Sequence, residues 1–126
     1  MRRAVLVALG AVLVAFAVFV AFIRGQTPSQ DPVKLSPQYY KVRLENDRVR
    51  VLEYHLKPGE KEVMHSHPAY VVSFLGDARV RTTLPDGTQA EAAITKDETI
   101  WRDAISHTTE NIGRTDVRAL VIELKR

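Results

Sequence analysis

The chain of 126 residues contains no cysteine. This absence excludes disulfide bonds, thiolate metal ligands and the acylated cysteine of a lipoprotein. Proline is scarce except in one stretch, because Pro28, Pro32 and Pro37, half of the six prolines, lie within residues 24–37. Polar residues fill most of this stretch, so we interpret it as a semi-extended linker that buries no core.

The sequence also lacks a basic pattern suited to nucleic acid. The formal net charge is +3, and without Arg2 and Arg3 sixteen basic residues face fifteen acidic ones. No stripe of lysine and arginine and no series of stacking aromatic side chains is visible. We therefore expect no nucleic acid among the partners.

A long apolar run stands at the N-terminus. Residues 4–23, from Ala4 to Ile23, carry no charge, and a helix of this length spans about 30 Å, the hydrocarbon core of a bilayer. Arg2 and Arg3 precede the run and favour a cytoplasmic N-terminus. We predict that residues 1–23 form a single-pass inner-membrane helix, with the rest of the chain on the periplasmic side. The alternative is a signal sequence cleaved after Gly25, which would release the domain to the periplasm.

The remainder, residues 38–126, has the size of one small domain. No repeat and no apolar stripe of helical period is visible there. β-branched and aromatic residues, with turns about every 8–12 residues, predict a β-sandwich or barrel. The expected strands are residues 39–44, 48–56, 62–67, 70–75, 79–84, 88–95, 98–102, 107–112 and 117–124.

Three of the four histidines follow one pattern. His65 and His67 are separated by one residue, and His107 follows forty residues later. Side chains two residues apart face the same side of a strand, so His65 and His67 converge if this segment is extended. Neutral imidazole is the commonest protein ligand of transition metals. We predict that the three histidines bind one divalent metal (Fe, Mn, Ni or Zn) if the chain folds back to bring His107 to the pair.

The residues around these histidines resemble the two motifs of the cupin superfamily. The first motif, Gly-x5-His-x-His, is matched from Gly59 to His67, and the second, His-x3-Asn, by His107 and Asn111. The sequence His-Ser-His-Pro and a Leu-Pro-Asp-Gly turn are similar to those of small single-domain cupins. The resemblance covers residues 38–125. It implies an all-β fold, a single antiparallel barrel (double-stranded β-helix or jelly roll), here preceded by one N-terminal hydrophobic helix.

Some positions depart from the family pattern. Family sites usually add a glutamate that is separated from the second histidine by three or four intervening residues, where this chain has Val71 and Val72. We expect these valines to make the pocket more hydrophobic. Glu110 has the opposite strand parity to His107, so we do not expect it to replace the missing ligand. Asn111 is expected to serve the following turn with Gly113.

Other side chains receive ordinary structural assignments. Arg79 and Arg81 alternate with apolar residues and should face solvent. Tyr70, Phe74 and Trp101 are expected in the core or in the pocket wall. His55 is interpreted as a surface histidine. Asp103 is the single carboxylate considered as a general base, with a place on a surface loop as the alternative, so the catalytic residues stay unidentified.

Three functions remain open for such a centre. The first is a metal-dependent enzyme, an oxygenase acting on a small organic substrate, because three neutral imidazoles leave coordination positions open. The second is a metal- or small-ligand-binding module without turnover. The third is an interaction module in which the histidines have lost their role. The resemblance adds that such domains often pair as homodimers through exposed sheet edges.

Overall fold

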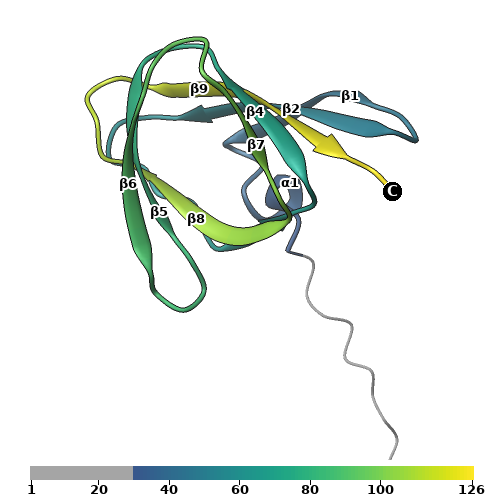
Figure 1. The fold of residues 1–126 in the computed structure, drawn as a ribbon, viewed down its shortest axis with the longest axis horizontal. Coiled ribbons are helices and arrows are strands. Elements are labelled where there is room, and N and C mark those ends of the chain that lie inside the picture. The colour runs from purple at the N-terminus through teal and green to yellow at the C-terminus, as the bar shows by residue number, and fades with distance from the viewer. Residues whose placement is uncertain (1–29) are drawn as a thin grey trace, which may run out of the picture.

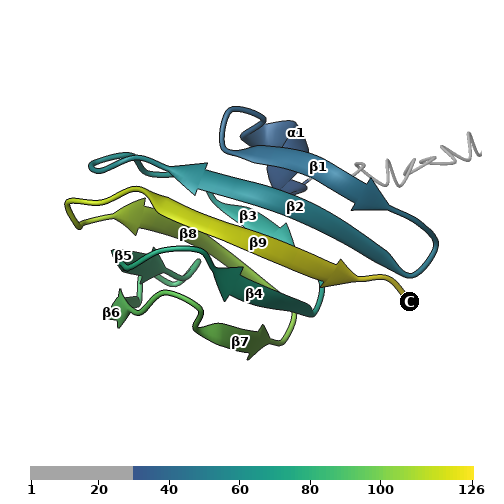
Figure 2. The ribbon, with the colours of Figure 1, turned by 90° about the horizontal axis from the view of Figure 1, so that it is seen from above.

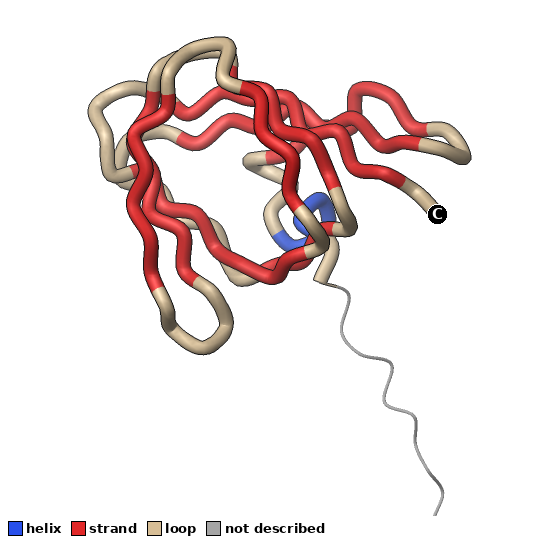
Figure 3. Tube along the Cα trace, viewed as in Figure 1, coloured by secondary structure: helices blue, strands red, loops and turns tan. Residues whose placement is uncertain are grey.

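The computed structural model describes residues 30–126, and the predicted membrane helix or signal sequence lies outside this range. The fold is all-β, with one short helix in the described part (Figure 1; Figure 3). The elements are α1 (Pro32–Leu35), β1 (Tyr40–Glu45), β2 (Val49–Leu56), β3 (His65–His67), β4 (Tyr70–Phe74), β5 (Ala78–Thr83), β6 (Gln89–Ile94), β7 (Thr99–Arg102), β8 (Ile105–Asn111) and β9 (Val117–Leu124). No helix among residues 30–126 is long and apolar enough to cross a membrane.

The strands form two antiparallel sheets. One sheet has five strands in the order β1-β2-β9-β4-β7, and the other has four in the order β3-β8-β5-β6. Figure 1 shows the two sheets closing into a ring of strands, from which β1 and the adjoining ends of β2 and β9 project to one side. Figure 2 shows the five-stranded sheet lying across β8 and β5. The expected barrel of jelly-roll type is therefore observed.

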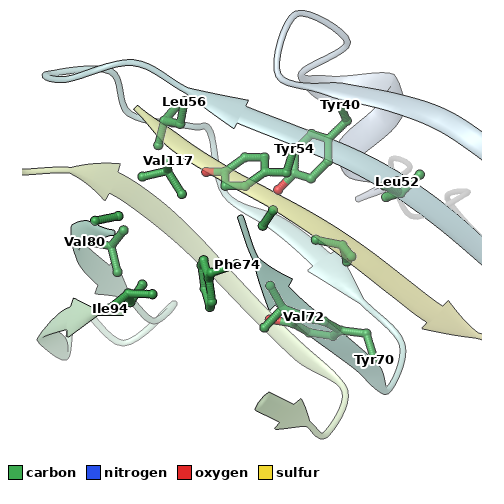
Figure 4. Packing of buried hydrophobic residues seen from close by; sticks show 13 residues of the cluster. Tyr40, Leu52, Tyr54, Leu56, Tyr70, Val72, Phe74, Val80, Ile94 and Val117 are labelled. Atoms are coloured by element: carbon green, nitrogen blue, oxygen red, sulfur yellow. The ribbon is translucent and has the colours of Figure 1, made fainter. Parts of the chain in front are cut away.

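Alternating side chains build the core between the sheets. In β2, β4 and β9 every second residue is buried, and the residues between them are more exposed. Their inward side chains meet those of the opposite sheet in one cluster (Figure 4). The buried apolar residues are Tyr40, Leu52, Tyr54, Leu56, Tyr70, Val72, Phe74, Ala78, Val80, Ile94, Val117, Ala119 and Val121. This period of two is the sequence signal that fixes which face of each strand is inside.

A tight turn joins β5 to β6, as the Leu-Pro-Asp-Gly sequence indicated. Gly87 has a φ of 87°, which a residue without a Cβ adopts at little cost. The Thr88 N–H donates to the Asp86 side chain at 2.9 Å, and the Leu84 N–H donates to the Thr88 carbonyl at 2.9 Å. The hairpin register follows from this closure, with Thr83 opposite Gln89.

The predicted linker differs from the structure at its C-terminal end. Residues 32–35 form α1, and Pro32 is fully buried against the barrel. Asp31 caps this helix by accepting from the Val33 N–H at 3.0 Å. Composition alone hid this packing, because a proline at the first turn of a helix is as compatible with burial as with an extended linker. Within the predicted linker, Pro32–Leu35 is therefore a helix that packs against the barrel.

Candidate metal centre

The three predicted histidines meet in the structure. His65 and His67 are buried on the inner face of β3, and the half-buried Ser66 between them faces the other way. β3 pairs with β8, and the register places His65 directly opposite His107. One ligand atom from each histidine lies within 4.8 Å of the other two. Antiparallel pairing thus supplies the fold-back that the sequence prediction required.

Hydrogen bonds fix the orientation of two imidazoles. The His65 Nδ1–H donates to the Val63 carbonyl at 2.9 Å, and the His67 Nδ1–H donates to the Glu123 carboxylate at 2.8 Å. A carbonyl and a carboxylate accept hydrogen bonds, so in each ring we place the hydrogen on Nδ1 and the lone pair on Nε2. Carbonyl and carboxylate partners of this kind orient metal-binding histidines.

The two Nε2 atoms face each other at 3.0 Å. Facing lone pairs repel unless a cation or a proton lies between them. Two nitrogen ligands with bonds of about 2.0–2.1 Å to one metal lie about 3 Å apart, so the observed spacing fits a shared ion. The donor set of neutral imidazoles suits zinc, iron, nickel or copper better than calcium or magnesium.

Burial keeps the imidazoles of His65 and His107 neutral. It lowers the pKa of His65 to about 4, and the neighbouring charge of His67 adds to the effect. Burial likewise lowers the pKa of His107 to about 3, with further contributions from His65 and His67. A protonated imidazole cannot bind a metal, so both rings are held in their ligand form at neutral pH.

A buried carboxyl group, Glu62, lies beside the cluster and was missed by the sequence analysis. Its side chain has no exposed surface, and its Oε2 lies 3.7 Å from His65 Nε2. Neither of its oxygens, nor the hydroxyl of Tyr54, has a hydrogen-bond partner in the described structure. Burial raises the pKa of Glu62 to about 7, against the opposing influence of Tyr40 and Tyr54. No periodic signal marks this residue, because it precedes the strand that carries the histidines.

Glu123 is the second site residue that the sequence analysis missed. It lies in β9 with the strand parity of Val117, Ala119 and Val121, and its side chain is 4% exposed. The parity was visible in the sequence and places Glu123 on the inner face. The residue was not recognised because a charged group near a strand end usually faces water.

A cavity of about 350 Å³ opens from the histidines between the two sheets. His67 and His107 form part of its wall, whereas most of the remaining lining is apolar. The main apolar lining residues are Val72, Phe74, Val80, Ile94, Val117 and Val121. Arg102 and Glu98 also lie in the wall. Val71 and Val72 occupy the positions of the missing glutamate and were expected to make the pocket more hydrophobic. Val72 lines this cavity, whereas Val71 does not.

The expectation for Trp101 is wrong, and for Asp103 the alternative of a place on a surface loop is confirmed. Trp101 is 54% exposed and does not line the cavity, although Tyr70 and Phe74 do. It lies opposite Val71 in the β4–β7 pair, on the outer face of the sheet. Asp103 is an exposed residue that accepts from the Trp101 Nε1–H at 3.1 Å, so it lies outside the cavity and is no candidate base there.

The remaining polar residues lie as expected. His55 is outside the histidine cluster and contacts Asp116 at 2.7 Å. Glu110 pairs with Arg81 at 3.2 Å instead of facing the metal centre. Asn111 accepts from the Gly113 N–H at 3.0 Å, which confirms its role in the turn.

Comparison with known proteins places the fold. No protein-family model matches the chain, and no curated protein matches its sequence. A cupin domain from Bordetella pertussis Tohama I is similar over 69% of this chain and 92% of its own, with 26% identity and a TM-score of 0.64. A cupin family protein with a double-stranded β-helix fold from Methanocaldococcus jannaschii is 12% identical over 68% of this chain and 78% of its own, with a TM-score of 0.56. A polyketide cyclase from Streptomyces resistomycificus is 19% identical over 69% of this chain and 64% of its own, with a TM-score of 0.53.

These likenesses define the class of the domain as a double-stranded β-helix of the cupin type. The two more distant structures bear on the fold alone. The B. pertussis domain has the highest identity of the three and is matched over nearly all of its own length. It supports membership of the cupin superfamily, in agreement with the histidine motifs.

Proposed function

We propose that this domain, a cupin of the His-Ser-His-Pro type, binds one divalent transition metal through His65, His67 and His107. The metal then holds a small organic ligand in the adjoining cavity. The observation that carries the proposal is the pair of Nε2 lone pairs that face each other at 3.0 Å beside His107. The hydrogen bonds to Val63 and Glu123 direct both Nε2 lone pairs towards a shared cation. The Tyr40 hydroxyl lies 3.4 Å from His65 Nε2, at the long end of hydrogen-bonding distance.

The cavity indicates the class of ligand. Its volume of about 350 Å³ falls near the lower end of the range for small-molecule sites. An apolar wall with imidazoles at one end suits a compact aliphatic or aromatic body that carries one metal-coordinating group, such as a carboxylate. Arg102, which is exposed but lines the same cavity, adds a positive charge to its wall.

A metal-dependent oxygenase is the enzyme that this arrangement supports. When bound, a three-histidine metal has open coordination positions and acts as a Lewis acid or, if iron, reacts with dioxygen. The protein would orient the substrate through the apolar wall and exclude water from its buried part. Glu62 is the carboxyl group placed to hold a proton near His65.

A non-catalytic ligand-binding module is the second candidate. The observation that favours it is the lack of an acid–base pair on the cavity wall within residues 30–126. Glu98 is the carboxylate found in the lining, and it is exposed. Glu62 is fully buried and does not reach the cavity wall.

Metal reconstitution separates the two candidates. The full chain would be loaded anaerobically with Fe(II), then mixed with thiols, catechols, β-diketones and small carboxylic acids while dioxygen is followed. Substrate-dependent uptake that is lost in His67→Ala supports the oxygenase. Ligand binding without oxygen uptake or product, across the Fe, Mn, Ni and Zn forms, supports the binding module.

We also propose that the domain acts at the outer face of the inner membrane, anchored by residues 4–23. The support is the uncharged run from Ala4 to Ile23 behind Arg2 and Arg3. The full-length protein should resist carbonate extraction, and protease added to spheroplasts should degrade the barrel. A periplasmic product that begins near Gln26 would establish cleavage instead.

A further inference from the structure

The segment before the barrel is joined to the metal centre by a chain of buried charges. Arg50 binds Asp31 with two hydrogen bonds of 2.9 Å, from its two terminal nitrogens to the two carboxylate oxygens. The Arg50 Nε–H donates to Glu123 Oε2 at 2.7 Å. The other oxygen of Glu123 accepts from His67 Nδ1 at 2.8 Å. Arg50 and Glu123 thus link Asp31, the N-terminal cap of α1, to the predicted metal ligand His67.

A second contact joins the same segment to the same strand. The Ser66 N–H donates to the Gln30 carbonyl at 2.8 Å, and Ser66 lies between His65 and His67. α1 itself is anchored by the burial of Pro32 and by Ser36, which is 1% exposed. Residues 30–36, which we call the N-terminal clasp, therefore contact the metal centre by two independent routes.

We propose that the N-terminal clasp is an outer part of the metal centre, with Arg50 and Asp31 as positioning residues that set metal affinity through Glu123 and His67. The inference rests on the metal centre proposed above. On this proposal, packing of the N-terminal clasp against the barrel strengthens metal binding, and metal binding stabilises the packed clasp.

The charges explain why Asp31 matters at a distance from the metal. The Arg50 Nε–H holds the Glu123 carboxylate in place against the His67 Nδ1–H, but the guanidinium charge also offsets the charge of that carboxylate. Asp31 occupies the far side of the guanidinium, so the group of three carries one surplus negative charge that favours a cation at His67. Burial raises the pKa of Asp31, but the hydrogen bonds and charge of Arg50 outweigh it and hold that pKa below its ordinary value, so Asp31 stays ionised at neutral pH.

The contacts are sheltered enough for these charges to act. The side chains of Arg50 and Glu123 are 15% and 4% exposed, and Asp31 is 24% exposed. Partly buried pairs are screened by salt much less than exposed ones. By contrast, Arg43 pairs with Glu53 on the neighbouring strands β1 and β2 with a side chain that is 53% exposed. Arg43 therefore offers a matched control of the same chemistry on the same sheet.

Metal titration of the full chain tests the coupling. Co(II) and Zn(II) dissociation constants would be measured by chelator competition for wild type, Arg50→Met, Asp31→Asn, the double variant and Arg43→Met. We expect Arg50→Met to weaken binding by about 10–100-fold, because the loss of the donor that positions Glu123 against His67 outweighs the gain in negative charge, and outer contacts of metal-binding histidines have effects of this size. Asp31→Asn should weaken it less, and Arg43→Met should match wild type. The double variant should equal Arg50→Met, because both residues act through one chain of contacts.

Coupling must also run in the other direction. Saturating Zn(II) should slow hydrogen exchange of the Ser36 amide, which donates to the Pro32 carbonyl at 2.8 Å, in wild type but not in Arg50→Met. A change in the visible spectrum of the Co(II) form of Arg50→Met would show that the ligand geometry has altered, which a loss of general stability would not produce. Equal affinities in wild type, Arg50→Met and Asp31→Asn would overturn the coupling alone. A wild-type chain that binds neither ion would overturn the metal centre and the coupling together.

Discussion

Two histidine–carboxylate pairs of similar length occupy opposite environments in this domain. His67 and Glu123 are 2.8 Å apart with side chains that are 2% and 4% exposed. His55 and Asp116 are 2.7 Å apart with side chains that are 31% and 38% exposed. The two distances are nearly equal, so distance alone does not explain why His67 belongs to the proposed metal centre and His55 does not. The difference must come from what surrounds each pair.

The surroundings differ in two ways. The buried pair presents the free nitrogen of His67 to two other imidazoles, whereas His55 lies outside any such cluster among the described residues. The exposed pair is surrounded by water and mobile ions, which weaken its electrostatic interaction. A short histidine–carboxylate distance is therefore insufficient to identify a functional site. Burial and a convergent third ligand make the distinction.

The largest expected effect separates His67 from His55. Replacing His67 with alanine should weaken transition-metal binding by at least about a hundredfold, since it removes a ligand and not merely its partner. His55→Ala should leave the dissociation constant unchanged. Isothermal titration of the full chain with Zn(II) measures both. Equal losses of zinc affinity in the two variants would show that burial and the neighbouring imidazoles do not distinguish His67 from His55.

Glu62 extends the comparison to a carboxyl group that lies 3.7 Å from a histidine but has no hydrogen-bond partner among the described residues. Its pKa is raised from 4.5 to about 7, so the folded protein keeps the proton over a range in which the unfolded chain has lost it. The contribution of Glu62 to stability in chelator should therefore fall as pH rises from 4.5 to 7, by an upper limit of about 3 kcal/mol. Glu62→Gln should abolish this fall and be more stable than wild type at pH 7.5.

Urea unfolding of wild type and Glu62→Gln at a series of pH values isolates the effect, because the histidines contribute equally to both proteins. Glu60→Gln is the control, since Glu60 belongs to the same segment and accepts from the Lys57 N–H at 2.8 Å on the surface. A pH-independent difference between wild type and Glu62→Gln would show that the Glu62 proton is not held by the fold.

Replacing the carboxylates of the two pairs should also have different effects on metal affinity, but the difference should be smaller than for the histidines. Glu123→Gln retains the size of the side chain but removes the charge that orients His67, so metal affinity should fall by about 10–100-fold. Asp116→Asn should have no effect on metal binding. Chelator competition with Co(II) detects both outcomes. Retained affinity in Glu123→Gln would mean that the neutral amide orients His67 as well as the carboxylate does.

The smallest effect concerns proton competition. Because the pKa values of His65 and His107 are lowered to about 4 and about 3, neither ring takes up a proton in the folded protein between pH 5 and 6.5. The logarithm of metal affinity should therefore change by at most about one unit per pH unit in this range, and not by up to about three. In chelator, the contribution of these two histidines to stability should be intact above pH 6.5 and decline as pH falls, since the unfolded histidines take up protons first. A steeper slope of metal affinity would show that the rings are not shielded from water.

Much of the fold was predictable because each strand carries a period of two. All nine expected strands are observed, and β9 has the predicted limits, Val117–Leu124. The largest difference is at β3, expected from residue 62 but beginning at His65. The Glu62 N–H instead donates to the Thr109 carbonyl at 3.0 Å in an irregular stretch. The alternation of apolar and polar residues does not reveal that the chain leaves the regular strand before His65.

The errors at Trp101 and the omission of Glu123 share one cause. Hydrophobicity suggested burial for Trp101, and charge suggested exposure for Glu123, although strand parity indicated the reverse. Trp101 pairs with Val71 on the outer face, whereas Glu123 pairs with Arg50 on the inner face of β2 and β9. Glu62 and the contact of Asp31 with Arg50 depend on the tertiary arrangement of segments far apart in the chain, and no local signal marks them.

Metal content tests the central claim most directly. The full chain and His107→Ala would be purified without added metal, loaded with one equivalent of Zn(II) and analysed by mass spectrometry after gel filtration. The account predicts one bound ion per wild-type chain and far less than one in His107→Ala. One ion per chain in both proteins would contradict the three-histidine centre.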